Sequence, residues 1–180
     1  MQINKQKGVF SIELAFVLIG MTSCLYFCFD LGFQQIRKSQ LERTAHSLVS
    51  LLKERSLFYP SSRGQQFHTR IQESQAQQLQ LIGAKLLNSK VEDVSVIIEE
   101  RLSGKHHLTR QALSPEVNCA PPFSLASKKL DITREKQDKY APIYQVTICQ
   151  RIPAWFERIM GNDPKKTDRI LTSYSTFIGR

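Results

Sequence analysis

The stretch GVFSIELAFVLIGMTSCLYFCF, residues 8–29, decides the fold of this chain. Glu13 is the one charged residue in it. A helix over residues 9–29 would span about 31 Å at the ordinary helical rise, which matches the hydrocarbon thickness of a bilayer. The stretch therefore predicts a transmembrane helix.

The residues before this stretch predict how the chain is oriented. Lys5 and Lys7 lie in the short segment ahead of the apolar run. Because basic residues favour the cytoplasmic side, we expect a single-pass protein with a cytoplasmic amino end. Residues from about 34 to 180 then face outward.

Glu13 is too costly at membrane depth to be incidental. An ionised side chain there costs about 2.5 kcal/mol or more, so it usually meets protein, water or a counter-charge. Cleavage after Gly8 would give Val9 a free ammonium group four residues from Glu13, at a helix end that already favours an anion. That amine could neutralise Glu13 within one chain, or the Glu13 of a neighbouring chain.

Gly8, Val9 and Glu13 resemble, position by position, the signal of type IV prepilins. That signal is a short basic leader ending in Gly, a hydrophobic residue, Glu at the fifth mature position and unbroken apolar sequence. The resemblance implies that a prepilin peptidase in the membrane cuts after Gly8 on the cytoplasmic side. It also implies that the apolar helix is kept as membrane anchor and filament core.

The whole chain resembles the Tad (tight adherence) pseudopilins of the TadE/TadF type, which serve Flp pili. The long exterior part, residues 144–149 and residues 173–180 carry this resemblance. Short major Flp pilins typically have Glu-Tyr where this chain has Glu13-Leu14, and they lack so large an exterior domain. The resemblance implies a pseudopilin or minor pilin that supports assembly or priming of an adhesive pilus from the bacterial inner membrane. Its partners would be the prepilin peptidase, other pseudopilins or pilins, the assembly machinery and membrane lipid.

Other interpretations of the amino end stay open. An uncleaved, signal-anchored periplasmic scaffolding or binding protein would show the same leader and span, but it leaves Glu13 unexplained. A cleaved secretory signal fits poorly, because an acidic residue interrupts its apolar region. Residues 21–24 resemble a loose lipobox that would lipidate Cys24. A minor pilin of another type IV-related machine is the remaining alternative.

The helical pattern continues beyond the membrane. Leu41, Ala45, Leu48 and Leu52 recur at one face of a helix among polar residues, so we expect an amphipathic stem. One helix could run from residue 9 to 57; the alternative is two helices broken near Gly32. The expected organisation is a leader (1–8), a transmembrane helix (9–29), a stem (30–58) and an exterior domain (59–180).

The exterior domain is predicted to be α+β and pilin-like, with a second helix and a small antiparallel sheet on the stem. A turn is expected at residues 59–64 and a second helix over 65–87, with an apolar face of Phe67, Ile71, Leu79, Ile82 and Leu86. Alternation predicts three strands, at 94–99, 144–149 and 169–178. We also expect a short strand within 123–132 and a short helix within 152–160 with Trp155 in the core.

The cysteines divide into two pairs. Cys119 and Cys149 lie outside the membrane span, where an exported domain meets an oxidising compartment, so we expect a disulfide between them. Closing this loop of about thirty residues would stabilise the domain by about 3 to 4 kcal/mol. Cys24 and Cys28 lie one turn apart in the apolar helix, and we expect them to act as small packing residues.

Charge and motif content argue against several classes of function. The chain has 25 basic and 16 acidic residues, a net charge of +9, or +7 without Lys5 and Lys7. The charges are mixed and no nucleic-acid motif is present, so we expect no nucleic-acid partner. The four histidines show no metal-ligand spacing, and no phosphate loop or nucleophile elbow occurs. We therefore expect no enzyme activity, metal, cofactor or small-molecule substrate.

Overall fold

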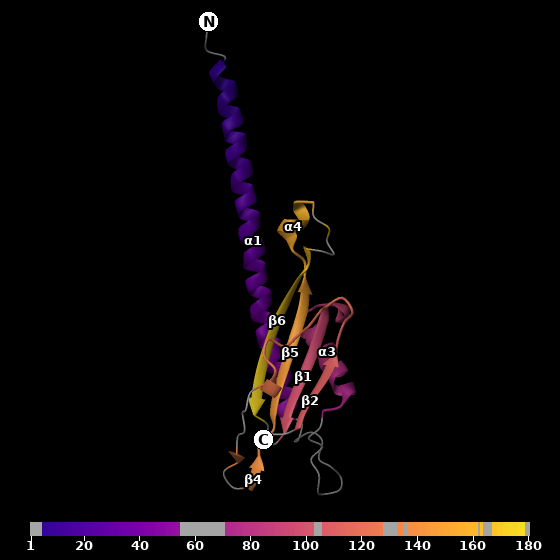
Figure 1. The fold of residues 1–180 in the computed structure, drawn as a ribbon. Coiled ribbons are helices and arrows are strands. Elements are labelled where there is room, and N and C mark those ends of the chain that lie inside the picture. Colours follow the sequence, from indigo (N-terminus) through magenta and orange to yellow (C-terminus); the bar gives the residue numbers. More distant parts are fainter. Residues whose placement is uncertain are drawn as a thin grey trace. The chain divides into compact units, whose positions relative to one another are not determined.

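One uninterrupted helix, α1 (Lys5–Lys53), begins the fold (Figure 1). The structure, a computed structural model, describes residues 5–54, 71–102, 106–127, 133–134, 137–161, 163 and 167–178. The chain divides into two units, one of Met1–Arg37 with Pro153–Thr167 and one of Lys38–Ile152 with Asp168–Arg180. Because α1 is continuous past Gly32, the alternative of two helices broken at that glycine is wrong.

The carboxyl-terminal part of α1 is the predicted amphipathic stem. Leu41, Ala45 and Leu48 have no exposed surface and Leu52 is 6% exposed, which confirms the predicted stripe. Phe177 also contacts this part of α1. The Phe177 and His46 rings lie edge-on, with 5.0 Å between their centroids, and Lys53 Nζ lies 5.2 Å from the centroid of the Phe177 ring. The stem is thus an integral part of the second unit's core.

The main sheet has four antiparallel strands, in the order β2-β1-β5-β6 (Figure 1). They are β1 (Val94–Leu102), β2 (His106–Ala112), β5 (Ile143–Ile152) and β6 (Arg169–Ile178). The three predicted strands are confirmed as β1, β5 and β6. The sequence analysis did not predict β2, because it is an edge strand whose half-exposed face shows no clear alternation.

The second helix, α3 (Glu73–Leu86), packs on the sheet with small residues. Its buried positions are Ala76, Leu79, Gly83 and Ala84. The predicted apolar face is confirmed at Leu79 and wrong at Ile82 and Leu86, which are 38% and 57% exposed; Ile71 is buried but precedes the helix. The small residues Ala76, Gly83 and Ala84 let α3 approach the sheet closely. The predicted turn at 59–64, residues 65–70 and Phe67 lie outside the described residues.

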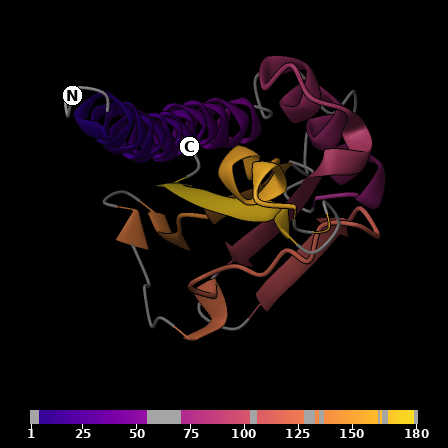
Figure 2. The same cartoon turned by 90° about the horizontal axis from the view of Figure 1, so that it is seen from above.

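The core lies between the helices and one face of the sheet. Val94, Val96, Ile98, Val146 and Ile148 point into it and are fully buried. Figure 2 shows α3 on this side of the sheet and the segment after β2 on the opposite side. The fold is therefore α+β, as the sequence predicted.

Short elements complete the chain. The second unit contains two 3-10 turns, η1 (Val91–Asp93) and η2 (Leu125–Ser127), and a hairpin of β3 (Thr133–Arg134) and β4 (Gln137–Tyr140). The strand predicted within 123–132 is wrong for residues 123–127, where η2 lies; residues 128–132 lie outside the described part. In the first unit, α4 (Trp155–Ile159) is the predicted short helix, followed by Gly161 at φ 84°.

Gly83 offers a direct test of the core packing. A Cβ there would lie 3.1 Å from Ile148 Cδ1 and 3.4 Å from Leu48 Cδ1. Gly83→Val should therefore overpack the core and lower the free energy of unfolding by about 1 to 3 kcal/mol. Urea denaturation of the full chain in detergent, followed by circular dichroism, measures this. Ile82→Val, at the exposed neighbour, should stay within about 0.5 kcal/mol of wild type; equal stability of both variants would contradict the packing.

Candidate functional site

The amino-terminal part of α1 presents an apolar surface on every side. Between residues 10 and 29 its large apolar side chains are between 47% and 73% exposed: Phe10, Ile12, Leu14, Phe16, Val17, Leu18, Ile19, Met21, Leu25, Tyr26, Phe27 and Phe29. By length and composition this helix could cross a membrane. A helix that is apolar all round must be covered by lipid or by other protein.

Glu13 lies within this apolar surface. Its side chain is exposed, and no residue in the described part of the chain gives it a cationic partner. Gly8 and Val9 lie five and four residues earlier in α1, and the exposure of these two residues lies outside the description. The backbone spacing predicted from the sequence is present, whereas charge neutralisation at Glu13 stays a prediction.

Other polar side chains also lie in the apolar stretch, among them those of Thr22, Cys24 and Cys28. Thr22 Oγ1 donates to the carbonyl oxygens of Leu18 and Ile19, at 2.9 and 3.0 Å, so its hydroxyl needs no outside partner. Cys24 and Cys28 are free thiols on the exposed surface. Their predicted packing role stays a prediction. Glu13 is thus the one charged side chain of the stretch, and no described residue gives it a cationic partner.

Asp30 ends the apolar stretch and is a residue that the sequence analysis did not single out. Although charged, it is only 4% exposed. Its Oδ1 accepts a hydrogen bond from the Trp155 backbone N–H at 3.2 Å, and its Oδ2 accepts one from Gln34 Nε2 at 3.2 Å. The Phe27 and Phe156 rings meet edge-on at 5.7 Å beside it. Asp30 therefore fastens the start of α4 to α1.

The prediction that Trp155 is a core residue was wrong. Its side chain is 53% exposed. The backbone of Trp155, rather than its indole ring, makes the tertiary contact with Asp30. Sequence reasoning failed here because an aromatic residue was assigned to the core by type alone.

On the second unit, a disulfide ties a long connection to the sheet. Cys119 and Cys149 are bonded, as the sequence predicted, with their Cα atoms 5.7 Å apart. Cys149 lies on the more polar face of β5, opposite the helices, and is fully buried. The segment between β2 and η2 therefore comes to that face and covers it.

Buried polar side chains fasten the same segment at two further points. Near one end, Ser95 Oγ accepts from the Ser114 backbone N–H at 2.9 Å and donates to the Val117 carbonyl at 3.3 Å. At the other, Glu99, only 2% exposed, accepts from Ser124 Oγ at 2.7 Å and Gln145 Nε2 at 3.0 Å. A sequence pattern does not reveal this role of Glu99, because a carboxylate in a strand usually marks a solvated face.

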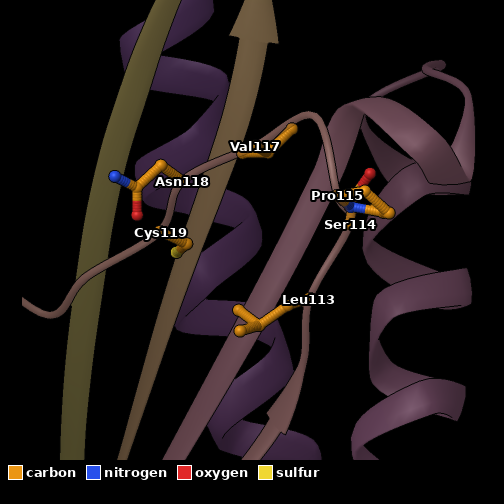
Figure 3. Close-up of a pocket in the computed structure, with 6 residues that line it drawn as sticks. All are labelled: Leu113, Ser114, Pro115, Val117, Asn118 and Cys119. Atoms are coloured by element: carbon orange, nitrogen blue, oxygen red, sulfur yellow. The ribbon is translucent and has the colours of Figure 1, made fainter.

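The covered face carries a shallow hollow of about 390 Å³ (Figure 3). Six residues line it: Leu113, Ser114, Pro115, Val117, Asn118 and Cys119. None has an ionised side chain, and Cys119 is held in the disulfide.

Arg151 joins three parts of the chain at the end of β5. Its guanidinium bonds Asp93 Oδ1 through Nη2 at 2.6 Å and Glu116 Oε2 through Nη1 at 2.5 Å, and lies 4.0 Å from Asp168 Oδ2. The hydrogen bond to Asp93, helped by the negative charges and opposed by burial, raises the pKa of Arg151. An arginine side chain is protonated throughout the ordinary pH range, so the guanidinium stays charged here.

One known protein family matches almost the entire sequence. The family described as tight adherence pilin protein F, TadF, matches residues 2–180. This chain belongs to the TadF family. Curated proteins and solved structures give no match to it.

TadF membership confirms the Tad type predicted from the sequence. The match includes both the apolar stretch and the exterior domain, whereas the prepilin signal alone covers about the first 30 residues. A TadF chain is a pilin protein associated with the Tad pilus, and it functions with other pilus components. Among the described residues of this TadF chain, one helix is long and apolar enough to cross a membrane, which fits a single-pass anchor.

Proposed function

We propose that this chain is a minor pilin or pseudopilin that supports assembly or priming of the Tad/Flp pilus and is cleaved after Gly8 by a prepilin peptidase. The carrying observation is Glu13, which is exposed, is the only charged residue of the apolar stretch 8–29 and lies four residues after Val9. Cleavage creates the amine that neutralises it. In this role the chain has no catalysis, cofactor or metal of its own.

Before assembly, residues 9–29 anchor the chain in the inner membrane, with the amino end cytoplasmic and the exterior domain periplasmic. During assembly, the Val9 amine of an incoming subunit meets Glu13 of its neighbour, and the apolar surfaces of the two helices pack together. The exposed apolar surface between Phe10 and Phe29 supports this packing role. The disulfide supports an oxidising compartment for the exterior domain.

The size of the exterior domain favours an accessory over the bulk filament subunit. A pilin that forms most of a Flp filament is short, whereas this chain folds a complete α+β unit after its stem. The competing proposal is an uncleaved, signal-anchored periplasmic scaffolding or binding protein. It shares the anchor and the domain but requires no removal of the leader.

Gly8→Leu separates these two functions. If cleavage is required, the variant should stay full length in the membrane fraction and fail to restore pili to a strain lacking the chain. Gln6→Leu, which places the same side chain two residues earlier, is the matched control and should be cleaved normally. Immunoblots of membranes and sheared pili, with pilus counts by electron microscopy, measure the result. Normal piliation by an uncleaved Gly8→Leu chain would favour the signal-anchored scaffold.

A further inference from the structure

The short helix α4 carries an exposed apolar cluster. Trp155, Ile159 and Met160 are 53%, 63% and 68% exposed. Trp155 and Ile159 lie one turn apart, so their side chains share a face of α4. We call these three residues the α4 cluster. Exposed residues of this size gathered in one place mark a surface that something covers.

The α4 cluster is held beside a particular level of α1. The Asp30 hydrogen bond to the Trp155 backbone N–H and the contact between the Phe27 and Phe156 rings fix α4 against residues 27–30. Both contacts lie within the first unit of the chain. The position of α4 along α1 is therefore defined by two contacts, which the side chains of Asp30 and Phe27 make with the start of α4.

That level is where the apolar stretch ends. Phe29 is its last residue and 73% exposed, and Asp30 is the first charged residue after Glu13. A membrane that covers residues 9–29 would have its polar headgroups beside Asp30. Tryptophan is enriched at this depth, because its ring is apolar while its N–H can reach water or headgroups.

We propose that α4 is an interfacial lipid-binding element, which inserts the α4 cluster into the headgroup region of the leaflet at the carboxyl end of the span. Asp30 holds α4 at this depth. Lipid is the favoured occupant because α4, which carries the cluster, contacts the exposed apolar surface of α1 through the Phe156 and Phe27 rings. The inference rests on the membrane anchoring in the proposed function.

Trp155 is the only tryptophan of the chain, so its fluorescence reports the α4 cluster alone. The full chain is reconstituted at high dilution in phosphatidylcholine and phosphatidylglycerol vesicles, with and without lipid brominated near the headgroup. We expect bromolipid to remove most of the Trp155 emission and aqueous acrylamide to quench it weakly. Emission that bromolipid leaves unchanged would overturn the proposal, whether acrylamide reaches Trp155 or a second protein copy shields it.

Two comparisons make the test specific. Asp30→Ala should reduce bromolipid quenching, whereas Asp30→Asn, which keeps an acceptor oxygen, should preserve it; equal quenching in both would refute the role of Asp30. In a Trp155→Phe background, Ser39→Trp places the reporter about 14 Å further along α1. Bromolipid should leave the tryptophan at position 39 unquenched. Quenching there as strong as at Trp155 would show that quenching does not depend on the level of the headgroups, and it would overturn the proposal.

Vesicle flotation separates this inference from the proposed function. A chain that floats with vesicles while Trp155 is unquenched refutes the lipid-binding role of α4 and leaves the anchor intact. A chain that fails to float refutes the anchor, and the inference with it.

Discussion

Glu13→Lys should abolish pilus assembly while leaving cleavage after Gly8 largely intact. The substitution replaces the one negative charge of the apolar stretch with a positive charge, so the Val9 amine would meet repulsion where attraction is expected. A charge left unpaired at membrane depth costs about 2.5 kcal/mol or more, enough to change an association constant by nearly two orders of magnitude. Pilus counts and immunoblots of the processed chain measure the two effects separately.

Glu42→Lys is the matched control for this change. Glu42 lies on an exposed face of the same helix, beyond the apolar stretch, so the same reversal of charge there meets water. It should leave both cleavage and piliation near wild type. Normal piliation by the Glu13→Lys chain would refute the role proposed for Glu13, and equal loss in both variants would show a general sensitivity of α1 to charge.

Removing the disulfide should have the largest effect on the stability of the exterior domain. Cys119→Ala with Cys149→Ala opens a loop whose ends are 30 residues apart. The free energy of unfolding should fall by about 3 to 4 kcal/mol, because the unfolded chain regains the freedom of that loop. Urea denaturation of the full chain in detergent measures this loss, and reduction of the wild-type chain should reproduce it.

Cys24→Ala with Cys28→Ala controls for the loss of two sulfur atoms. Both thiols are free and exposed on the apolar part of α1, so their removal should leave the urea midpoint of the exterior domain unchanged. If the Cys119/Cys149 variant were as stable as this control, the polar contacts of Ser95 and Glu99 alone would suffice to hold the covering segment.

The long helix and the disulfide could be predicted because their signals are local or exclusive. The stripe of Leu41, Ala45, Leu48 and Leu52 has the period of one helix face, and its burial follows from that period. Two of the four cysteines lie in the apolar stretch, which left Cys119 and Cys149 as partners. Neither prediction required knowledge of the tertiary contacts.

The features that sequence reasoning missed depend on those tertiary contacts. Strand β2 is paired through its backbone with β1, and its own residues carry little apolar pattern. The inner face of α3 is formed by small residues such as Gly83, which hydropathy undervalues. Asp30 and Glu99 are buried carboxylates whose partners come from 125 and 46 residues away, at Trp155 and Gln145.

In the proposed mechanism, the charge of Glu13 is matched by an amine that exists only after the leader has been removed. Intact mass spectrometry of the chain extracted from membranes and pili of its native host tests this most directly. We expect a mature chain that begins at Val9. A chain that retains Met1 to Gly8 in assembled pili would contradict it.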